Sequence, residues 1–229
     1  MLTCSVVVPV KDDGGALVRC LAALAAQRLP ATEVVVVDNG SSDASAAIAA
    51  AHGARVVREG RRGIAAAASA GYDAASGDLI LRLDADSRPH PDWTRRVVDR
   101  FAGDAALDAL SGPGEFTAVP RPLRRALTGW YWRAYFSRIG REVGGPPLFG
   151  SNLAMRRGAW LRVADLVHRD DLEVHDDLDL TVHLREAGCR MVVDPALVVP
   201  VSARPLVHPF GLLGRVRKAD HTIALHPAT

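Results

Sequence analysis

Polar side chains follow three strand-like runs in the first half of the chain. They form the segments Val10–Asp13, Asp38–Ser41 and Asp84–Asp86. The carboxyl ends of neighbouring parallel strands meet at one edge of a sheet, where open α/β sheets bind their ligands. We therefore expect the three segments to share one ligand site.

Asp84 and Asp86 have a spacing that suits a metal site. Side chains two positions apart in an extended segment point to the same side, so both carboxylates can face one ligand. Carboxylate oxygens are hard ligands that suit Mg²⁺ or Mn²⁺, and such an ion can share its coordination with phosphate oxygens. Aspartate is also common in turns at strand ends, so a structural role is the alternative.

A second acidic cluster, Asp176, Asp177 and Asp179, lies far along the chain at the expected start of a helix. Aspartates stabilise a helix N-terminus through its dipole, which is a structural explanation for them. Three acids within four positions also repel one another, and a structural role does not require that cost. The crowding favours a chemical role.

The elements around these residues predict an α/β fold with a mainly parallel central sheet and helices on both faces. β-Branched runs predict strands at Ser5–Val10, Glu33–Val37, Ala54–Val57, Asp78–Leu83 and Leu107–Leu110. Apolar spacing and capping residues predict helices at Gly14–Gln27, Ser41–Ala51, Gly63–Ala75 and Pro91–Phe101.

The second half of the chain is less regular, because prolines and glycines interrupt it. Its pattern predicts helices at Leu123–Ile139 and Asp176–Ala187, and strands or extended segments at Leu148–Arg156, Met191–Val193 and Leu197–Val201. We find no internal repeat and no low-complexity linker, so we expect one continuous domain over residues 1–229.

Composition excludes several classes of protein. Hydrophobic residues make up 48% and charged residues 24%, and the formal net charge of +2 does not indicate a nucleic-acid partner. Three cysteines without CxxC spacing indicate reduced thiols rather than a disulfide framework or a zinc site. Met1 leads directly into a strand-like run and no stretch is apolar enough to span a membrane, so we expect a cytoplasmic protein without a signal peptide.

The segment Arg121–Arg141 combines aromatic and basic residues, with six arginines and no acid. Its aromatic residues are Trp130, Tyr131, Trp132, Tyr135 and Phe136. Large aromatics are usually core residues, so packing on the sheet is one explanation. The other is an acceptor platform or a membrane-surface helix, whose arginines meet an anionic surface or a lipid phosphate.

Together the motifs resemble those of the family 2 glycosyltransferases, which have the GT-A fold. The matching segments, in the family's order, are VVVPVKDDGGALVRCLAALAAQ, VVVVDNGSSD, GDLILRLDADS, FGSNLAMRR and HDDLDLTVHLREAG. The resemblance implies a hexosyltransferase that moves a sugar from a nucleotide-diphosphate donor to an acceptor hydroxyl. It also implies Mn²⁺ or Mg²⁺ as cofactor and inversion at the anomeric carbon.

The resemblance implies roles for individual residues. Asp177 corresponds to the catalytic base, Asp38 to the acid that recognises the nucleotide base, and Asp86, with Asp84, to the metal ligands. Further donor-binding positions are Pro9, Val10, Lys11, Arg62, Gly63 and Ala85. The loop at the donor sugar and acceptor comprises Gly150, Ser151 and Asn152, with Asp176 nearby.

The chain departs from the family pattern at two places. Asn39 stands where a second acid is common, and Ala68-Ser69 replaces a frequent Arg-Asn pair. Either Arg61 or Arg62 compensates for the lost arginine, or the two are a solvated pair.

Two alternative functions follow from the same pattern. A sugar nucleotidyltransferase has a similar sheet, but its glycine-rich loop after the first strand does not resemble Pro9–Asp12. A non-catalytic module that binds a nucleotide sugar would have lost the acids that bind the metal or the acid that serves as the catalytic base. Asp84, Asp86 and Asp177 are all present.

The resemblance divides the domain into a nucleotide-binding half at 1–112, an acceptor half at 113–203 and a C-terminal tail at 204–229. The tail is either a solvated terminal helix or a lid that closes over the donor. In a lid, His208 or His221 would complete the metal site, since neutral imidazole accompanies carboxylates well on Mn²⁺. The acceptor is not identified by the sequence; a lipid-linked acceptor at the inner face of a membrane is one option.

Overall fold

The computed structural model describes residues 2–117, 121–202 and 209–226, with side chains for all of these except 121–127 and 209–212. The strands are β1 (Cys4–Val10), β2 (Glu33–Asp38), β3 (Arg55–Arg58), β4 (Leu79–Arg82), β5 (Ala109–Ser111), β6 (Gly114–Phe116), β7 (Leu153–Arg156), β8 (Met191–Val193) and β9 (Val199–Val201). The helices are α1 (Gly14–Ala25), α2 (Ser45–Ala51), α3 (Ile64–Ala74), α4 (Trp93–Ala102), α5 (Arg121–Glu142), the 3₁₀ helix η1 (Gly150–Asn152), α6 (Arg157–Val163), α7 (Asp176–Glu186) and α9 (Pro209–Leu225).

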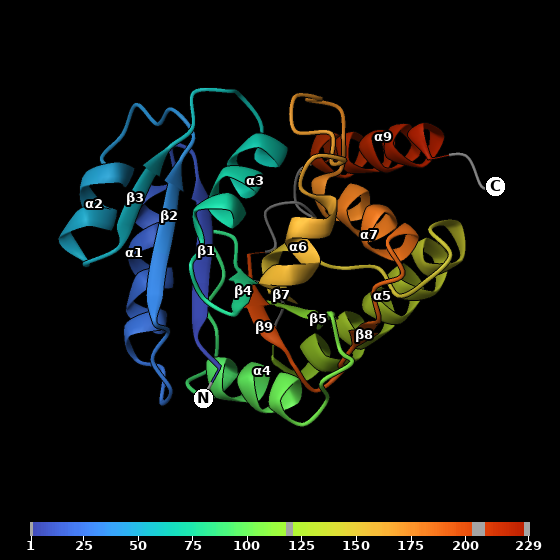
Figure 1. Ribbon diagram of the computed structural model, residues 1–229, viewed down its shortest axis with the longest axis horizontal. Coiled ribbons are helices and arrows are strands. Elements are labelled where there is room, and N and C mark those ends of the chain that lie inside the picture. The colour runs from blue at the N-terminus through green and yellow to red at the C-terminus, as the bar shows by residue number, and fades with distance from the viewer. Residues whose placement is uncertain (1, 118–120, 203–208, 227–229) are drawn as a thin grey trace.

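A seven-stranded sheet in the order β3-β2-β1-β4-β7-β5-β8 forms the centre of the fold (Figure 1). Its neighbouring strands are parallel except at β7, which runs antiparallel to both β4 and β5. β6 and β9 pair in a separate parallel sheet. The mainly parallel sheet predicted from the sequence is confirmed.

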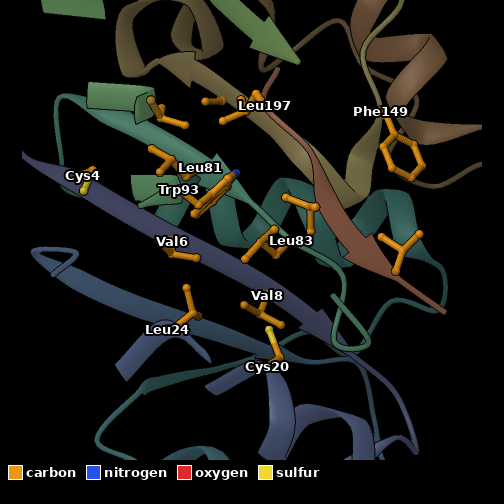
Figure 2. Close-up of a cluster of buried hydrophobic side chains, with 14 of the residues drawn as sticks. Cys4, Val6, Val8, Cys20, Leu24, Leu81, Leu83, Trp93, Phe149 and Leu197 are labelled. Carbon is orange, nitrogen blue, oxygen red and sulfur yellow. The ribbon is translucent and has the colours of Figure 1, made fainter. Parts of the chain in front are cut away.

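Helices cover both faces of the sheet, because successive strand residues point to opposite sides. Val6 and Val8 of β1 belong to a hydrophobic cluster that includes residues of α1 and α4, part of which Figure 2 shows. Val7, between them, belongs to a second cluster with residues of α3, α6 and α7. The alternation therefore confirms the predicted arrangement of helices on both faces.

Helix α3 packs close to the sheet because its residues are small. A Cβ atom on Gly71 would lie 2.2 Å from Val7 Cγ1 and 2.9 Å from Val37 Cγ2. Ala67 and Ala68 are buried in the same interface. Any larger side chain would push α3 away from the sheet, which explains why this helix is so rich in alanine.

The strands β1, β2 and β4 end at the same edge of the sheet. Val10 pairs with Asp38 across β1 and β2, and Val7 pairs with Arg82 across β1 and β4. The loops that follow are tied together, since Lys11 Nζ donates to the carbonyl oxygen of Gly40 at 2.9 Å.

Several elements differ from the sequence-based prediction. Helix α2 begins at Ser45 rather than Ser41, because the Asp43 carboxylate accepts hydrogen bonds from the N–H groups of Ser45 and Gly14 and holds the preceding residues in a loop. The extended segment predicted at Leu148–Arg156 divides into η1 and β7. The sequence pattern does not predict α6, whose 7 residues are too few to show a clear period.

Within the described part of the chain, no helix combines the length and the apolar character needed to cross a bilayer. All three cysteines are buried and unpaired.

Candidate active site

A pocket of about 680 Å³ opens at the carboxyl edge of the sheet. Its walls come from the ends of β1 and β4, from η1, from the start of α7, and from α5 and α9. The residues predicted for the site that line this pocket are Pro9, Val10, Lys11, Asp84, Ala85, Asp86, Gly150, Ser151, Asp176 and Asp177. The structure therefore brings Asp84 and Asp86 to one cavity with Asp176 and Asp177, the first two acids of the second cluster.

The other predicted site residues lie elsewhere. Asp38 is buried at the end of β2, next to Val10, and its Oδ1 accepts a hydrogen bond from a backbone N–H in its own loop. Arg62, Gly63, Asn152 and His221 are also outside the pocket wall. The remaining candidate, His208, lies outside the described residues.

Asp84 and Asp86 occupy a turn directly after β4. Asp84 Oδ1 accepts a hydrogen bond from Arg82 Nη2 at 3.2 Å, and its Oδ2 accepts one from the Ser151 hydroxyl. These two contacts fix the orientation of the Asp84 carboxylate at the pocket wall. Asp86 is half-buried and reaches the same pocket.

The Arg82 guanidinium connects the two acidic clusters. The side chain is 3% exposed and pairs with Asp84, just after β4, and with Asp176 at the start of α7. Burial opposes the charged form, but the two carboxylates raise the pKa of Arg82 well above its ordinary value. A buried cation between two acids from distant parts of the chain fixes their relative position.

Asp177 is buried at the pocket and is held by two neighbours. Its Oδ2 accepts a hydrogen bond from the Gly150 N–H at 2.8 Å, and His175 Nδ1 lies 2.5 Å from its Oδ1. Burial raises the pKa of Asp177, but the charge of His175, that of Arg82 and the bond from Gly150 outweigh it and lower the pKa to about 2. The carboxylate is therefore ionised near neutral pH and can accept a proton.

The loop Gly150–Asn152 has one polar side chain towards the pocket and one towards the core. A Cβ atom on Gly150 would lie 2.8 Å from Arg82 Cζ, so this position has no room for a side chain. Ser151 bonds Asp84. Asn152 instead accepts a hydrogen bond from Trp93 Nε1 at 2.9 Å and is fully buried, so its role is to anchor the loop.

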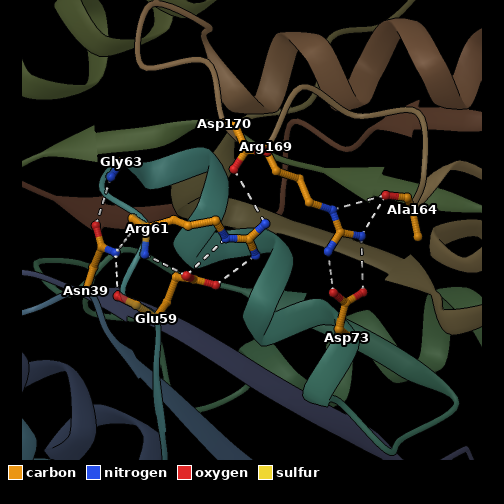
Figure 3. Close-up of polar contacts among 8 residues, drawn as sticks. All are labelled: Asn39, Glu59, Arg61, Gly63, Asp73, Ala164, Arg169 and Asp170. Carbon is orange, nitrogen blue, oxygen red and sulfur yellow. Dashed lines mark hydrogen bonds and ion pairs between the residues drawn. The ribbon is translucent and has the colours of Figure 1, made fainter.

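Asn39 fixes the loop that precedes α3, as Figure 3 shows. Its Nδ2 donates to the carbonyl oxygens of Glu59, at 3.0 Å, and Arg61, at 2.6 Å, and its Oδ1 accepts from the Gly63 N–H at 3.0 Å. A carboxylate has no N–H donor and could not make the first two bonds. This pairing gives a structural reason for asparagine at a position where an acid is more common.

Arg61 is engaged away from the pocket. Its guanidinium lies 2.9 Å from Glu59 Oε2 and 3.5 Å from Asp170, which belongs to the segment between α6 and α7. Arg169, the neighbour of Asp170 in that segment, pairs with Asp73 of α3 (Figure 3). Arg62 is exposed and outside the pocket wall. These contacts fasten the segment between α6 and α7 onto α3.

Aromatic residues of α5 form an apolar wall of the pocket. Trp132 is 4% exposed and its ring lies 4.4 Å from that of Phe149, whereas Trp130 is 67% exposed. The helix is thus part of the core on one side and open to solvent on the other. The side chains of the arginines at 121, 124 and 125 lie outside the described part of the structure.

Helix α9, in the C-terminal tail, forms another wall of the pocket. Arg215, Val216 and Lys218 line the cavity. His221, one turn further along, instead pairs with Asp171, with 2.8 Å between its Nε2 and the carboxylate.

Two residues of the site escape prediction from the sequence. Arg82 interrupts the apolar strand LILRLD, and an unpaired charge is rarely buried, so its presence was a signal that acids lie nearby. His175 directly precedes the acidic cluster.

A mainly parallel sheet with paired acids after β4 and further acids at the start of α7, all meeting at one pocket, defines a GT-A type glycosyltransferase. The sequence profile of glycosyl transferase family 2 matches residues 5–160. The chain belongs to this family and is a glycosyltransferase domain.

Curated relatives agree with the family. An uncharacterised glycosyltransferase of Mycobacterium tuberculosis is 31% identical over 194 residues, which cover 82% of this chain and 81% of the relative. Glycosyltransferase AglE of Haloferax volcanii is 33% identical over 121 residues, which cover 49% of this chain and 40% of AglE. The alignment with AglE thus spans less than half of that relative's length.

Solved structures show the same fold. The mannosyltransferase PcManGT from Pyrobaculum calidifontis, in complex with GDP-Man and Mn²⁺, has a TM-score of 0.74 at 22% identity and covers 100% of this chain, which spans 65% of that protein. Glucosyl-3-phosphoglycerate synthase from Mycobacterium tuberculosis, in complex with UDP, has a TM-score of 0.70 at 20% identity, with 98% and 79% of the two chains covered.

We expect Arg82→Met to lower the free energy of unfolding by about 3–5 kcal/mol, because it removes a buried cation and leaves Asp176, which is 12% exposed, and Asp84 without their partner. Urea denaturation at neutral pH measures the loss. Arg28→Met is the matched control, since it removes an exposed ion pair with Asp92 and should cost less than about 1 kcal/mol. A similarly small loss for Arg82→Met would show that the buried pair does not hold the site together.

Proposed function

We propose that this domain is a metal-dependent, inverting glycosyltransferase that moves a hexose from a nucleotide-diphosphate donor to an acceptor hydroxyl. The observation that carries the proposal is that Asp84, Asp86 and Asp177, from motifs far apart in the sequence, line one pocket. Solved relatives of the same fold are complexes with GDP-Man and Mn²⁺ and with UDP-glucose and Mn²⁺, which supports a nucleotide sugar as donor.

The residues after β4 fit a divalent cation. Asp84 and Asp86 present carboxylate oxygens to the pocket from one short turn, and oxygen donors are what Mg²⁺ and Mn²⁺ prefer. We propose Asp86 as the principal metal ligand, with Asp84 oriented by Arg82 and Ser151. A bound cation would neutralise the negative charge that develops on the diphosphate leaving group.

The donor is proposed to lie along the carboxyl edge of the sheet. Asp38 is the candidate for recognising the nucleotide base, and Pro9, Val10, Lys11, Arg62, Gly63 and Ala85 are the further candidates for donor contacts. In support, Lys11 and Ala85 line the pocket. Asn39, which follows Asp38, accepts a hydrogen bond from the Gly63 N–H and so joins the loop after β2 to the loop before α3.

We propose Asp177 as the general base. The acceptor oxygen forms its bond to the anomeric carbon while the bond from that carbon to the diphosphate breaks, and the hydroxyl proton passes to Asp177. A direct displacement of this kind inverts the anomeric carbon. Since the pKa of Asp177 is about 2, it is a weak base before reaction, and its work comes late, when bond formation has made the hydroxyl proton acidic.

We propose an acceptor with an apolar part and a phosphate, such as a polyprenyl phosphate presented at an anionic membrane surface. Trp130, Tyr131 and Tyr135 of α5 would contact the apolar part, while Arg138 and Arg215 line the same pocket and favour an anionic group. An undecaprenyl-phosphate 4-deoxy-4-formamido-L-arabinose transferase of Pseudomonas aeruginosa is 36% identical over 43% of this chain and 32% of its own length, which supports this class of acceptor.

We expect Asp86→Ala to lower nucleotide-sugar turnover by at least 100-fold, because it removes a ligand of the cation that stabilises the leaving group. EDTA should abolish turnover of the unaltered protein, and added Mn²⁺ should restore it. Asp99→Ala, at an exposed position on α4, is the control. Full turnover in EDTA or in the Asp86 variant would refute metal dependence.

We expect Asp177→Asn to lower kcat by about 10²–10⁴-fold while donor affinity changes little, since the amide keeps the shape but cannot accept the proton. Steady-state kinetics and nucleotide binding separate the two effects. Asp170→Asn, an exposed acid outside the pocket wall, is the control. Loss of donor binding with an unchanged kcat would make Asp177 a binding residue instead.

We expect the protein to bind vesicles of phosphatidylglycerol more tightly than vesicles of phosphatidylcholine, and to release the former as salt rises, because exposed charges are screened over about 8–10 Å at physiological ionic strength. Trp130→Ala should weaken this binding, whereas Leu161→Ala, equally apolar and 58% exposed on α6, should not. No vesicle binding at low salt, with transfer to 3-phosphoglycerate but not to polyprenyl phosphate, would favour a water-soluble acceptor.

A further inference from the structure

Four side chains outside the candidate active site converge on one point near the end of α9. This histidine cluster consists of His168 from the segment between α6 and α7, Asp179 and His183 from α7, and His226, which directly follows α9. One ligand atom from each side chain lies within 4.8 Å of those of the other three. Segments almost sixty residues apart thus meet at a set of groups that all can bind metal.

Asp179 lies at the centre of the cluster. Its Oδ1 is 2.7 Å from His168 Nδ1, 2.9 Å from His226 Nε2 and 3.5 Å from His183 Nε2. The carboxylate is 2% exposed. The carboxylate is thus shielded from water, and one of its oxygens is directed at nitrogen atoms of three imidazole rings.

His183 is the part of the cluster that protein contacts do not satisfy. The residue is 8% exposed, and its Nε2 atom, although near Asp179, has no hydrogen-bond partner. A buried polar atom without a partner costs about 1–3 kcal/mol. On the other side of the ring, Nδ1 lies 3.9 Å from a carboxylate oxygen of Glu186. That distance is too long for a direct hydrogen bond.

The cluster is separate from the proposed catalytic metal. None of its four residues lines the main pocket. Asp177 and Asp179 both belong to α7, but successive residues of a helix turn by about 100°, so the two carboxylates face different sides of it. Asp177 faces Gly150 and Asp179 faces His168.

We propose that the histidine cluster binds a structural Zn²⁺ ion through three imidazoles and one carboxylate. Zinc takes histidine nitrogen and aspartate oxygen, and sites with four protein ligands are structural rather than catalytic. The hard cations Mg²⁺ and Ca²⁺ prefer sites made of oxygen alone. The ion would neutralise Asp179 and use the unsatisfied Nε2 of His183.

The site would act as a clasp for the C-terminal helix. His226 follows α9 directly, and α9 contributes Arg215 and Lys218 to the wall of the main pocket. Helices α7 and α9 contact each other, and Figure 1 shows them side by side near the C-terminus. A metal ion that joins His226 to α7 therefore fixes the wall that α9 forms.

The test measures metal binding in the full chain carrying Asp86→Ala, which lacks the proposed principal ligand of the catalytic metal. Zinc binding to the histidine cluster is then tested separately from the proposed function, on which it does not depend. Metal-free protein should take up about one Zn²⁺ per chain in a titration. Co²⁺ in its place should give the visible absorption of a tetrahedral site. Zinc should also raise the melting temperature.

Adding His226→Ala should weaken Zn²⁺ binding by at least about 100-fold, since even the loss of an outer partner of a metal ligand costs about 10–100-fold. His221→Ala, which removes an α9 histidine that pairs with Asp171, should leave Zn²⁺ binding unchanged. If His226→Ala does not fold, His168→Ala, in the segment between α6 and α7, gives the same comparison. Absence of Zn²⁺ uptake, or uptake unaffected by both cluster variants, would overturn the proposal.

Discussion

The arrangement of this site depends on one buried ion pair network around Arg82. A guanidinium that is 3% exposed must have anionic partners, and the partners are Asp84 from the turn after its strand and Asp176 from α7. Because the cation lies between them, the end of β4 and the start of α7 are held together although almost a hundred residues separate them. Gly150 is part of the same constraint, since the guanidinium fills the space where a side chain would be. The network thus joins one acid of each cluster, Asp84 and Asp176, at the wall of the pocket.

The close packing of the first half supplies the platform for that network. Small residues of α3 let this helix approach β1 and β2, and the side chain of Asn39 then fixes the loop before α3 by bonds that need an amide. Arg61 and Arg169 complete the support by pairing with Glu59 and Asp73. Arg61 and Arg169 therefore stabilise the structure around α3, whereas Lys11, Arg138 and Arg215 line the pocket.

Sequence reasoning identifies those parts of the site that follow from local pattern. Asp84 and Asp86 come directly after an apolar run, and Asp177 lies in a crowded helix start, so their types and spacing are visible in the sequence. Contacts between distant segments are not visible in that way. Nothing local shows that Arg82 meets Asp176, that Asn152 turns to Trp93 in the core, or that His168 and His226 meet at Asp179. These relations depend on how the sheet brings the segments together. Short elements such as α6 are missed for a different reason, since 7 residues show no clear period.

The crowded acids at the start of α7 are explained by the separate partners that each of them has. Successive positions turn by about 100° around a helix, so Asp179 faces a different side from Asp177, whereas Asp176 and Asp177 keep carboxylate oxygens within 4.8 Å of each other. Asp176 meets Arg82, Asp177 meets Gly150 and His175, and Asp179 lies among the histidines. Each negative charge has its own partner, and all three gain from the positive end of the helix dipole. Part of the repulsion inferred from the sequence remains: burial raises the pKa of Asp176 and the nearby Asp177 charge adds to this, while Arg82 opposes it. One helix start can therefore serve the pocket on one side and hold the C-terminal helix on the other.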